Sequence, residues 1–453
     1  MTGHTTPPSD TLTLGVIGLG HVGLPTALGF AEMGWHVVGT DEDAPKSDRI
    51  ARGEAPFYEP GLQLLLERHI DSGLFRVAQN MASAVAQSQV LFICVGTPTD
   101  DDGQVDLSQL DAVAPAIAES LNGYKVIVEK STSPVLTARR ILESVALHTQ
   151  GPHHFDMAVN PEFLREGSAV ADVLAPDRLV LGVEAERARD LLLRVYQPLL
   201  DGTRPGTPPD LLITDLNTAE IIKHASNSFL AAKISFINMI ADLCEATGAD
   251  VTEVARGMGM DPRIAPHFLQ AGAGYGGSCF PKDLRAFIQI GQGHGVDMSL
   301  LTEVERINDR RIELIVRKVE QGADGLRGKT VAILGLAFKP GTDDIRDAPS
   351  LRIIPRLLEA GAFLRLHDPQ AADSVRQAFP EGDREVMYCA TPAETARSAD
   401  ALLLLTEWDE YRTMDLLAIG KAMTARTLID ARNLYDPATV RALGFRYISV
   451  GRS

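Results

Sequence analysis

This chain has few cysteines, and none of them is spaced for a metal or a disulfide framework. Its 453 residues contain four, at positions 94, 244, 279 and 389, and no C-x-x-C pair. Such spacing argues against a disulfide-rich secreted module and against a zinc site, and it suits free thiols in a reducing cytosol. We therefore expect a cytoplasmic protein that holds no metal.

Long apolar runs and an excess of positive charge are also missing. No apolar run reaches the roughly 20 residues that a membrane-spanning helix requires, and the polar residues 1–10 predict a flexible tail and no signal peptide. The formal net charge of −17 argues against general binding of nucleic acid or a membrane surface, because both are anionic. A local basic pocket for one small phosphate ligand remains compatible with that charge.

The pattern of apolar segments divides the chain into three domains. Residues 11–205 alternate between strand and helix patterns, which is typical of an α/β domain with a parallel sheet. Residues 206–325 are mainly helical, and residues 326–453 return to the alternation. We expect two Rossmann-like doubly wound domains joined by a central helical domain. The expected strands are residues 12–17, 37–40, 90–95, 125–129, 155–159, 330–335, 362–368, 401–406 and 427–430.

A long helical pattern without glycine or proline runs through the central domain. It covers about residues 214–247, on the order of 50 Å at 1.5 Å per residue, and a second pattern covers about residues 299–321. A helix of that length indicates a spine between domains or a subunit interface. The proline- and glycine-rich residues 197–210 are expected to form a surface connection before it.

A glycine-rich turn follows the first expected strand. Gly18, Gly20 and Gly23 form G-x-G-x-x-G in the segment LGVIGLGHVGLP, between a strand and a helix. In a dinucleotide site the first glycine permits the turn, the second admits the pyrophosphate and the third lets helix and strand pack. Asp41 ends the second strand, where a carboxylate binds ribose hydroxyls and repels a 2′-phosphate. NAD is therefore the expected cofactor; FAD is its main competitor, and glycines that serve only a turn are the other alternative.

Two polar residues share one face of the long helix. Lys223 and Asn227 are four residues apart, so they lie one helical turn from each other among mostly apolar or small neighbours. The lysine could hold an anionic oxygen or polarise a water, and the asparagine could position it. A solvated lysine and an asparagine satisfied by its own helix are the alternative.

A short acidic turn follows the fifth expected strand. In the segment NPEFLREG, Glu162 and Glu166 are four residues apart at the carboxyl edge of the sheet, where doubly wound folds bind ligands. One carboxylate could act as a base or orient water. Two ordinary solvated acids at the start of a helix are the alternative.

The segment GYGGSCFPKD places one cysteine in a glycine-rich loop. Its glycines let the backbone approach a ligand closely, and Lys282 near Cys279 favours the thiolate, which is the nucleophilic form. Asp283 could accept a proton. A cysteine that only packs is the alternative, and packing is what we expect of Cys94, which follows the apolar run VLFI.

Nine motifs in their order along the chain resemble the UDP-glucose 6-dehydrogenase family, within the nucleotide-sugar 6-dehydrogenases. The resemblance covers about residues 12–451. The motifs are GLGHVGLP, TD at 40–41, GEAPFYEPG, VGTPT, EKST, NPEFLREG, the helix with Lys223 and Asn227, GYGGSCFPKD, and FKPGTDDIR.

The resemblance implies a four-electron oxidation that uses two NAD⁺. The primary alcohol of the sugar loses a hydride to give an aldehyde, which Cys279 attacks. A second hydride transfer converts the thiohemiacetal to a thioester, and water then releases the uronic acid. This route fits a nucleophile in the site, because an aldehyde must form a tetrahedral adduct before it can lose a hydride.

The resemblance also implies roles for single residues. Lys223 would stabilise charge on the sugar oxygen, Asn227 would hold that oxygen, and Asp283 would assist proton transfers. Glu166 and Thr132 would help to place the hydrolytic water. The implied NAD contacts are Gly18, Gly20, Val22, Gly23, Asp41, Lys46, Thr97, Pro98, Thr99, Glu129 and Thr132. The implied contacts to the nucleotide sugar are Glu162, Phe163, Leu164, Arg165, Lys223, Asn227, Arg263, Phe268, Tyr275, Gly276, Phe338, Lys339, Arg346 and Arg432.

One of these residues implies an oligomer, and three other positions depart from the family's pattern. Arg263 matches an arginine that reaches a neighbouring subunit's site, so the resemblance implies a homodimer or a larger homo-oligomer. Ser133 and Leu136 stand where many members have valine and glycine, and His21 stands where tyrosine is frequent. None of the three removes a catalytic group, but each could alter cofactor affinity or loop shape.

Three alternatives stay open on the sequence alone. The substrate could be another nucleotide sugar, such as GDP-mannose or a UDP-N-acetylhexosamine. A two-electron dehydrogenase of the hydroxy-acid or 6-phosphogluconate type shares a Rossmann domain and a long-helix domain, but that chemistry requires neither Cys279 nor a third domain. A nucleotide-sugar sensor without chemistry is the last. The sequence does not divide the proton transfers among Asp283, Lys223 and Glu166.

Overall fold

The computed structural model describes residues 12–99, 104–151, 154–202, 207–382 and 385–452. The expected tail at residues 1–10 and the expected domain boundary at 205–206 lie outside these ranges. The chain divides into two compact units after Ala225, called here the N-terminal unit and the C-terminal unit. None of the helices in the described ranges has the length and hydropathy needed to cross a membrane.

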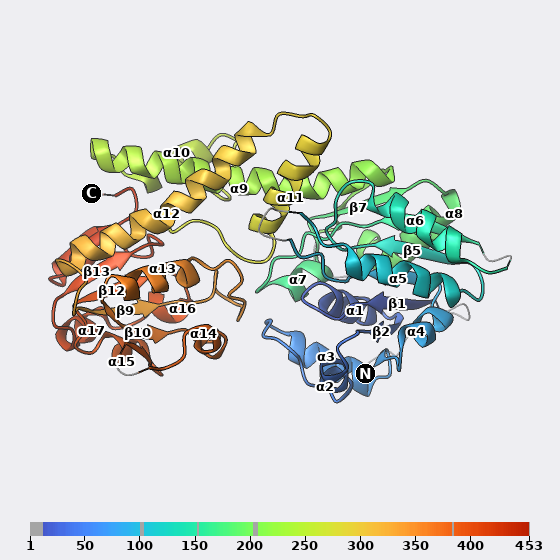
Figure 1. Ribbon diagram of the computed structural model, residues 1–453, viewed down its shortest axis with the longest axis horizontal. Coiled ribbons are helices and arrows are strands. Elements are labelled where there is room, and N and C mark those ends of the chain that lie inside the picture. The colour runs from blue at the N-terminus through green and yellow to red at the C-terminus, as the bar shows by residue number, and fades with distance from the viewer. Residues whose placement is uncertain (1–11, 100–103, 152–153, 203–206, 383–384, 453) are drawn as a thin grey trace. The chain divides into compact units, whose positions relative to one another are not determined.

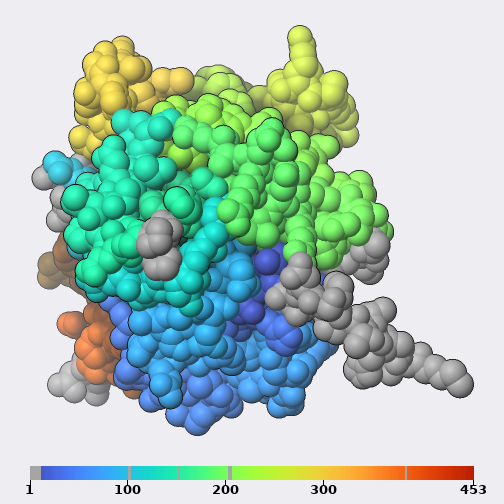
Figure 2. Space-filling view, turned by 90° about the vertical axis from the view of Figure 1, so that its right-hand side faces the viewer, coloured from blue at the N-terminus to red at the C-terminus, as the bar shows by residue number. Residues whose placement is uncertain are grey.

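The N-terminal unit is built on an eight-stranded sheet (Figure 1). Across the sheet the strands are β3 (Phe75–Val77), β2 (His36–Thr40), β1 (Thr13–Ile17), β4 (Val90–Ile93), β5 (Lys125–Glu129), β6 (Phe155–Val159), β7 (Arg178–Val183) and β8 (Asp210–Thr214). In the space-filling view the blue segments of this unit lie at the bottom and green segments lie towards the top (Figure 2).

Helices cover both faces of this sheet. Because successive side chains of a strand point to opposite faces, Val16 and Phe92 join the core with α1, α3 and α8, whereas Ile17 and Ile93 join the core with α5, α6 and α9. This is the doubly wound arrangement that the alternation predicted. The helices are α1 (Gly23–Glu32), α2 (Ala44–Ala51), α3 (Leu62–Asp71), α4 (Met81–Gln87), α5 (Ser108–Glu119), α6 (Thr137–His148), α7 (Ala169–Leu174), α8 (Glu186–Leu200) and α9 (Leu216–Thr247), which continues past Ala225.

The expectation of a parallel sheet holds through β6 and fails at the next strand. β7 pairs with β6 in the antiparallel sense, and β8 then runs parallel to β7. Parallel neighbours need a long crossover connection, but the helix between β6 and β7, α7, has only six residues. The connection between β6 and β7, which lies wholly within the described ranges, therefore contains one short helix and no long crossover helix.

The expected surface connection at 197–210 is shorter than predicted. Helix α8 runs to Leu200 with Pro198 inside it, and β8 begins at Asp210. A proline inside a helix removes one hydrogen bond and costs about 3 kcal/mol. The helix nevertheless continues because its apolar face, with Leu192, Val195 and Leu199, is buried in the core of the N-terminal unit.

The C-terminal unit contains a second, six-stranded sheet in which all neighbours are parallel. Across the sheet the strands are β11 (Val386–Tyr388), β10 (Phe363–His367), β9 (Thr330–Leu334), β12 (Ala401–Leu404), β13 (Thr427–Asp430) and β14 (Arg446–Ser449). The helices of this unit that follow α9 are α10 (Val251–Gly259), α11 (Phe280–Gly293), α12 (Ser299–Ala323), α13 (Pro349–Glu359), α14 (Ala372–Ala378), α15 (Pro392–Ala396), α16 (Asp409–Arg412), α17 (Leu416–Ala422) and α18 (Pro437–Ala442).

Two long helices of the C-terminal unit pack with its sheet. Helix α9 has 32 residues and α12 has 25, close to the two patterns predicted. Ile237 of α9, Ile315 of α12 and Ile333 of β9 belong to one buried core. The second sheet and the long helices therefore share a core.

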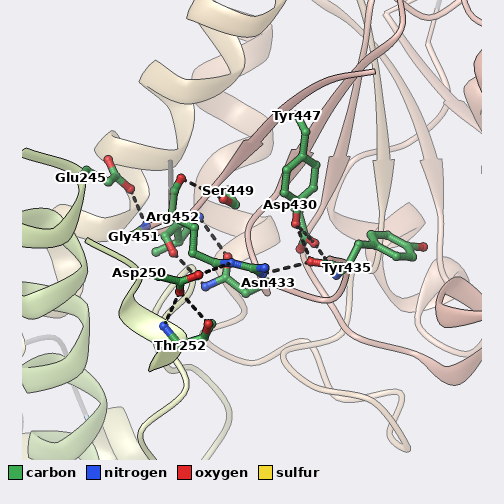
Figure 3. Close-up of polar contacts among 11 residues, drawn as sticks. Glu245, Asp250, Thr252, Asp430, Asn433, Tyr435, Tyr447, Ser449, Gly451 and Arg452 are labelled. Atoms are coloured by element: carbon green, nitrogen blue, oxygen red, sulfur yellow. Dashed lines mark hydrogen bonds and ion pairs between the residues drawn. The ribbon is translucent and has the colours of Figure 1, made fainter. Parts of the chain in front are cut away.

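The last described residues fasten the second sheet to α9 and α10 (Figure 3). The Gly451 amide donates to Glu245 Oε1 of α9 at 2.7 Å, and the Gly451 carbonyl accepts from Val251 N of α10 at 2.8 Å. Arg452 donates through Nη1 to the carbonyl of Tyr435 at 3.0 Å, and its Nε lies 3.6 Å from Asp250 Oδ2. A side chain at Gly451 would collide with Ala241 of α9, since its Cβ would lie 2.7 Å from that of Ala241.

Candidate active site

The glycine-rich turn joins β1 to α1, and its three glycines have different surroundings. A Cβ on Gly18 would lie 2.6 Å from the carbonyl oxygen of Cys94, and one on Gly23 would lie 1.8 Å from the carbonyl oxygen of Gly18. A Cβ on Gly20 would meet nothing within 4 Å. The outer glycines are therefore required by packing, and the middle one faces open space beside the start of α1, headed by Val22. These surroundings fit a dinucleotide, whose pyrophosphate lies against such a helix N-terminus.

Asp41 is held beside this turn by hydrogen bonds and an ion pair. It follows β2, and its side chain is 6% exposed. Oδ2 accepts from the Leu19 amide at 2.7 Å and lies 2.9 Å from Lys46 Nζ. The carboxylate is thereby fixed at the edge of the site, as binding of ribose hydroxyls requires.

The loops after β4 and β5 lie together at the carboxyl edge of the same sheet. Thr97 donates its hydroxyl to the carbonyl of Thr132 at 2.6 Å. Pro98 is exposed and Thr99 is half-buried, whereas Glu129, the last residue of β5, is 1% exposed. Burial and the neighbouring Glu220 raise the pKa of Glu129 well above its usual value. This carboxyl group is therefore part of a buried network.

The lysine and the first glutamate of the predicted pairs form a buried ion pair. Lys223 Nζ donates to Glu162 Oε1 at 2.8 Å, with side chains 5% and 4% exposed. Glu162 Oε2 accepts from the Leu164 amide at 2.6 Å, and the ammonium lies 5.5 Å from the centre of the Phe163 ring. The alternative of a solvated lysine and a solvated Glu162 is therefore wrong.

The remaining residues of the acidic turn are oriented by other carboxylates. Arg165 directs its guanidinium to Asp172, with Nη2 and Oδ1 2.6 Å apart, so its backbone is the part left to border a ligand. Glu59 accepts from the amides of Gly167 and Ala169 at 2.7 and 2.9 Å. Glu166, between these two anchors, is half-buried.

In the C-terminal unit, Cys279 is the residue that caps helix α11. Phe280 is the first helical residue, and the Asp283 amide donates to the Cys279 carbonyl at 2.8 Å. The thiol is partly exposed, with the Ser278 hydroxyl 3.6 Å from its sulfur, whereas the other three cysteines are buried. The positive end of a helix dipole stabilises a thiolate. Cys279 therefore differs from the packing cysteines, including Cys94.

Asp283 is fully buried one turn into α11 and connects the cysteine loop to α9. Its Oδ2 accepts from Asn227 Nδ2 at 2.6 Å, and its Oδ1 lies 2.8 Å from Lys282 Nζ. Asn227 follows Lys223 by one turn of the same helix. Asn227 and Asp283 thus form one group with Cys279 in the C-terminal unit, and Lys223 belongs to the Glu162 group.

The cysteine loop packs on the loop that follows β9. A Cβ on Gly277 would lie 2.6 Å from the Phe338 ring, and one on Gly276 would lie 2.3 Å from the carbonyl of Asp347. Arg432, which follows β13, donates to the carbonyls of Leu405 at 2.6 Å and Phe338 at 3.2 Å. The two loops are held within contact distance and need glycine where they meet.

The other predicted contacts of this unit surround these loops. Tyr275 is buried and held by Asn308, which accepts from its amide at 2.9 Å. Lys339 Nζ lies 5.5 Å from the centre of the neighbouring Phe338 ring. Arg346 is paired with Asp344, and the Phe268 ring lies 6.0 Å from that of Phe280. Arg263 is on the surface, 87% exposed, and paired with Asp261.

Four residues of these networks were missed by sequence reasoning. Lys130 is buried and donates to Asn160 Oδ1 at 3.0 Å. Glu59 and Glu220 are buried carboxylates that accept from distant backbone amides, and buried His224 lies within hydrogen-bond distance of a distant backbone carbonyl. Glu59 lies inside the GEAPFYEPG motif and Lys130 inside the EKST motif, so these motifs could have indicated both residues as parts of the site. Glu220 and His224 flank Lys223 on α9.

Three family models match consecutive parts of the chain. They are the NAD binding domain, the central domain and the UDP binding domain of the UDP-glucose/GDP-mannose dehydrogenase family, at residues 12–200, 217–310 and 332–437.

Similar proteins match over nearly the whole length. UDP-glucose 6-dehydrogenase of Rhizobium meliloti is 43% identical over 442 residues, which cover 96% of this chain and 99% of the relative. The enzyme of the same name from Pseudomonas aeruginosa is 43% identical over 451 residues, with 97% and 98% covered. The structure of a UDP-glucose dehydrogenase from Pyrobaculum islandicum has a TM-score of 0.90 at 36% identity and covers 100% of both chains.

Proposed function

Because this chain belongs to the UDP-glucose/GDP-mannose dehydrogenase family, we propose that it oxidises carbon 6 of UDP-glucose to give UDP-glucuronate, with NAD⁺ as electron acceptor. The observation that carries the proposal is Cys279 at the start of α11, because oxidation of an aldehyde to an acid needs a nucleophile. Two molecules of NAD⁺, bound one after the other, would each supply a hydride acceptor for carbon 6. The turn at Gly18–Gly23, with Asp41, would hold each of them.

Cys279 supplies the covalent chemistry. Its thiolate attacks the aldehyde carbon, so that a carbon–sulfur bond forms and the carbonyl oxygen takes a proton. After the second oxidation the group is a thioester. Water then attacks that carbon, the carbon–sulfur bond breaks, and Cys279 leaves as the thiolate that the N-terminus of α11 stabilises.

Lys223 and Asn227 supply polar groups for the oxygen on carbon 6. Lys223 carries its charge in a buried environment opposite Glu162, where an ammonium interacts more strongly with a developing oxyanion than it would in water. Asn227 is oriented by Asp283. Asp283 would assist proton transfers, and Glu166 and Thr132 would help to place the hydrolytic water.

The UDP part of the substrate would be held by the C-terminal unit. Support comes from the match to the UDP binding domain and from the contact of the cysteine loop with the loop of Phe338 and Lys339. Tyr275, Gly276, Phe338, Lys339, Arg346 and Arg432 would provide the nucleotide contacts. Glu162 and the backbone of residues 163–165 would border the sugar.

The experiment that tests this function counts NADH per substrate. We expect two NADH for each UDP-glucose consumed, and turnover of UDP-glucose faster than that of GDP-mannose or a UDP-N-acetylhexosamine. One NADH per substrate would support a two-electron dehydrogenase instead. Faster turnover of GDP-mannose than of UDP-glucose would show that GDP-mannose is the substrate.

The role of Cys279 is tested by Cys279→Ser, with Cys244→Ser as the control because Cys244 is a buried core residue. We expect the Cys279 variant to stall after aldehyde formation or to trap an adduct, while the control keeps both oxidations. Full uronate production by Cys279→Ser would falsify the covalent step.

A homo-oligomer is the second part of the proposal. Four apolar side chains lie exposed along one face of α9 within the C-terminal unit: Phe229 (67%), Phe236 (44%), Met239 (45%) and Leu243 (58%). They recur at intervals of seven, three and four residues, as in a helix that packs against a partner. A dimer through this stripe, with Arg263 reaching the partner, is the proposed state. The four free thiols also suit the reducing cytoplasm.

A further inference from the structure

A buried carboxylate on α9 is tied to the loop that carries Thr132. Glu220 is 4% exposed, and its Oε2 accepts from the Leu136 amide at 2.8 Å while its Oε1 accepts from the Ala138 amide at 2.9 Å. These amides lie at the first turn of α6, where backbone donors have no partner within the helix. A side chain more than 80 residues away in the sequence therefore caps α6, as the separations of 84 and 82 residues show.

The next turn of α9 holds the same loop at a second point. His224 is 1% exposed, and its Nε2 lies 2.8 Å from the Ser133 carbonyl oxygen. On the opposite side, Ser131 donates its hydroxyl to the Val95 carbonyl at 2.7 Å, and the Thr132 carbonyl accepts from Thr97. Residues 131–138 are thus fixed between α9 and the loop after β4.

Lys223 lies between the two anchors on α9. The segment 220–224 therefore holds the loop of Thr132 through Glu220 and His224, and it also carries the ammonium that pairs with Glu162. Because one rigid helical turn makes these contacts, it sets the distance between Thr132 and Lys223.

A second carboxyl group completes the network around Glu220. Ser133 donates its hydroxyl to Glu129 Oε1, and Glu129 is 1% exposed. Burial raises the pKa of both glutamates, and the charge of Glu220 raises that of Glu129 further. The amides of Leu136 and Ala138 act in the opposite direction and lower the pKa of Glu220.

We propose that Glu220, together with His224, is a positioning residue for the reaction, which holds Thr132 at a fixed distance from Lys223 so that Thr132 can place the hydrolytic water. The proposal rests on the proposed function. Glu220 acts through the backbone of Leu136 and Ala138 and touches neither substrate nor cofactor.

Glu220→Gln tests the proposal, because the amide group keeps one acceptor and turns a donor towards the second backbone amide. We expect kcat with UDP-glucose to fall on the order of 10- to 100-fold, as misplacement of a reacting group by about 1 Å produces, with KM for UDP-glucose changed less than threefold. Slow hydrolysis should leave a thioester on Cys279, visible as added mass of the intact protein. In the ligand-free protein, the backbone amides of residues 131–138 should exchange hydrogen faster in Glu220→Gln than in the parent protein.

Asn80→Ala is the matched control. Asn80 caps α4 of the same unit by accepting from the Ser83 amide at 2.9 Å, and it lies outside the proposed site. Asn80→Ala should lower thermal stability about as much as Glu220→Gln does, and it should leave kcat unchanged. A Glu220→Gln variant with the kcat of Asn80→Ala would overturn the proposal, and so would a lowered kcat without the covalent adduct.

A second pair of variants covers the case in which Glu220→Gln does not fold. His224→Gln keeps a donor for the Ser133 carbonyl, and His224→Leu removes it. We expect the adduct with His224→Leu and little effect of His224→Gln; equal kcat in both would overturn the proposal. The parent protein is assayed first, since failure to turn over UDP-glucose there would reject the proposed function and not this positioning role.

Discussion

Buried charges are the single residues whose loss should have the largest effects. The Lys223–Glu162 pair is nearly inaccessible to water, so each charge depends on the other for its stabilisation. Removing one member of such a pair costs about 3–5 kcal/mol, because the other remains as an uncompensated charge. An exposed pair of similar length, such as that of Arg140 and Asp111 at 2.6 Å, contributes less than about 1 kcal/mol.

Lys223→Met should therefore lower the free energy of unfolding by about 3–5 kcal/mol. Glu162→Gln added to Lys223→Met should restore much of that loss, while activity stays absent because the ammonium is gone. Urea denaturation of the two single variants and the double variant measures the coupling. Arg140→Met is the control, and a loss no larger in Lys223→Met than in this surface variant would contradict the prediction.

A second buried lysine should make stability depend on pH. Lys125 is 3% exposed and donates to the Ser88 carbonyl at 2.6 Å, and burial lowers its pKa from 10.5 to about 8. Below about pH 8 both folded and unfolded states bind the proton, so the cost of the buried charge is fully present. Between about pH 8 and pH 10.5 the folded protein has lost the proton of Lys125, whereas the unfolded chain still binds it. The free energy of unfolding therefore rises with pH in this range, by up to about 1.4 kcal/mol per pH unit.

Lys125→Met should lack this rise. The free energy of unfolding of the parent should rise between pH 7.5 and pH 10, and that of the variant should lack this contribution. The difference, variant minus parent, should therefore fall as the pH increases, whatever the difference is at pH 7.5. Losing the donor to Ser88 shifts the difference equally at every pH. Urea denaturation along this pH series measures it, and a difference that stays constant would show that Lys125 does not titrate in this range.

Sequence reasoning succeeded for site residues whose surroundings are local. Gly18, Gly20 and Gly23 follow one another within a single turn, so their spacing alone predicts the steric roles that the structure shows. Burial of Lys223 and the partners of Glu220 depend on chain segments 61 to 84 residues away. No local pattern encodes which distant carboxylate or amide will meet a side chain, so these contacts required the structure.

At the scale of elements, helix α6 begins at a residue in an unfavourable conformation. Leu136 has φ +77°, in the left-handed region, and Glu220 binds its amide. A side chain there costs roughly 1–2 kcal/mol, whereas glycine adopts the conformation freely. Leucine, which stands here where many family members have glycine, is therefore strained at this position. The hydrogen bond from its amide to Glu220 of α9 helps to hold the left-handed conformation.

Leu136→Gly should be stabilising by less than about 1 kcal/mol, because the relieved strain is partly offset by the greater freedom of glycine in the unfolded chain. Leu136→Val should be destabilising, since a β-branched side chain fits this region worse. Leu147→Gly, at an exposed position of the same helix, is the control and should cost about 1 kcal/mol. Thermal unfolding measures all three, and a Leu136→Gly loss equal to that of Leu147→Gly would contradict the strain.

Sequence patterns predicted the bounds of three strands correctly. The strands at 125–129, 155–159 and 427–430 have the expected bounds, because each contains apolar residues and is followed by polar residues or a turn. The three-residue strands β3 and β11 were missed, since so few residues show no period. The strands β7, β8 and β14 were missed as well, and with β7 its antiparallel pairing to β6.

At the scale of the whole molecule, the exposed apolar stripe of α9 predicts the state of association. Phe229→Lys with Phe236→Lys should convert a dimer to a monomer, because two charges would be buried without partners at its centre. Sedimentation velocity measures the mass. Leu147→Lys adds a charge at an exposed site of the N-terminal unit and should leave the mass unchanged. An unchanged mass in the double variant would place the interface elsewhere.

Helix α9 also determines the order in which the two cores can be completed during synthesis. Leu216 and Ala219 belong to a core of the N-terminal unit, so that unit can close once the first turns of α9 have left the ribosome. The core of the C-terminal unit contains both Ile237 of α9 and Val450, near the end of the chain. The core around Ile237 is therefore completed only when more than 200 further residues have been made. This interval is when a nascent chain of this protein most needs a chaperone.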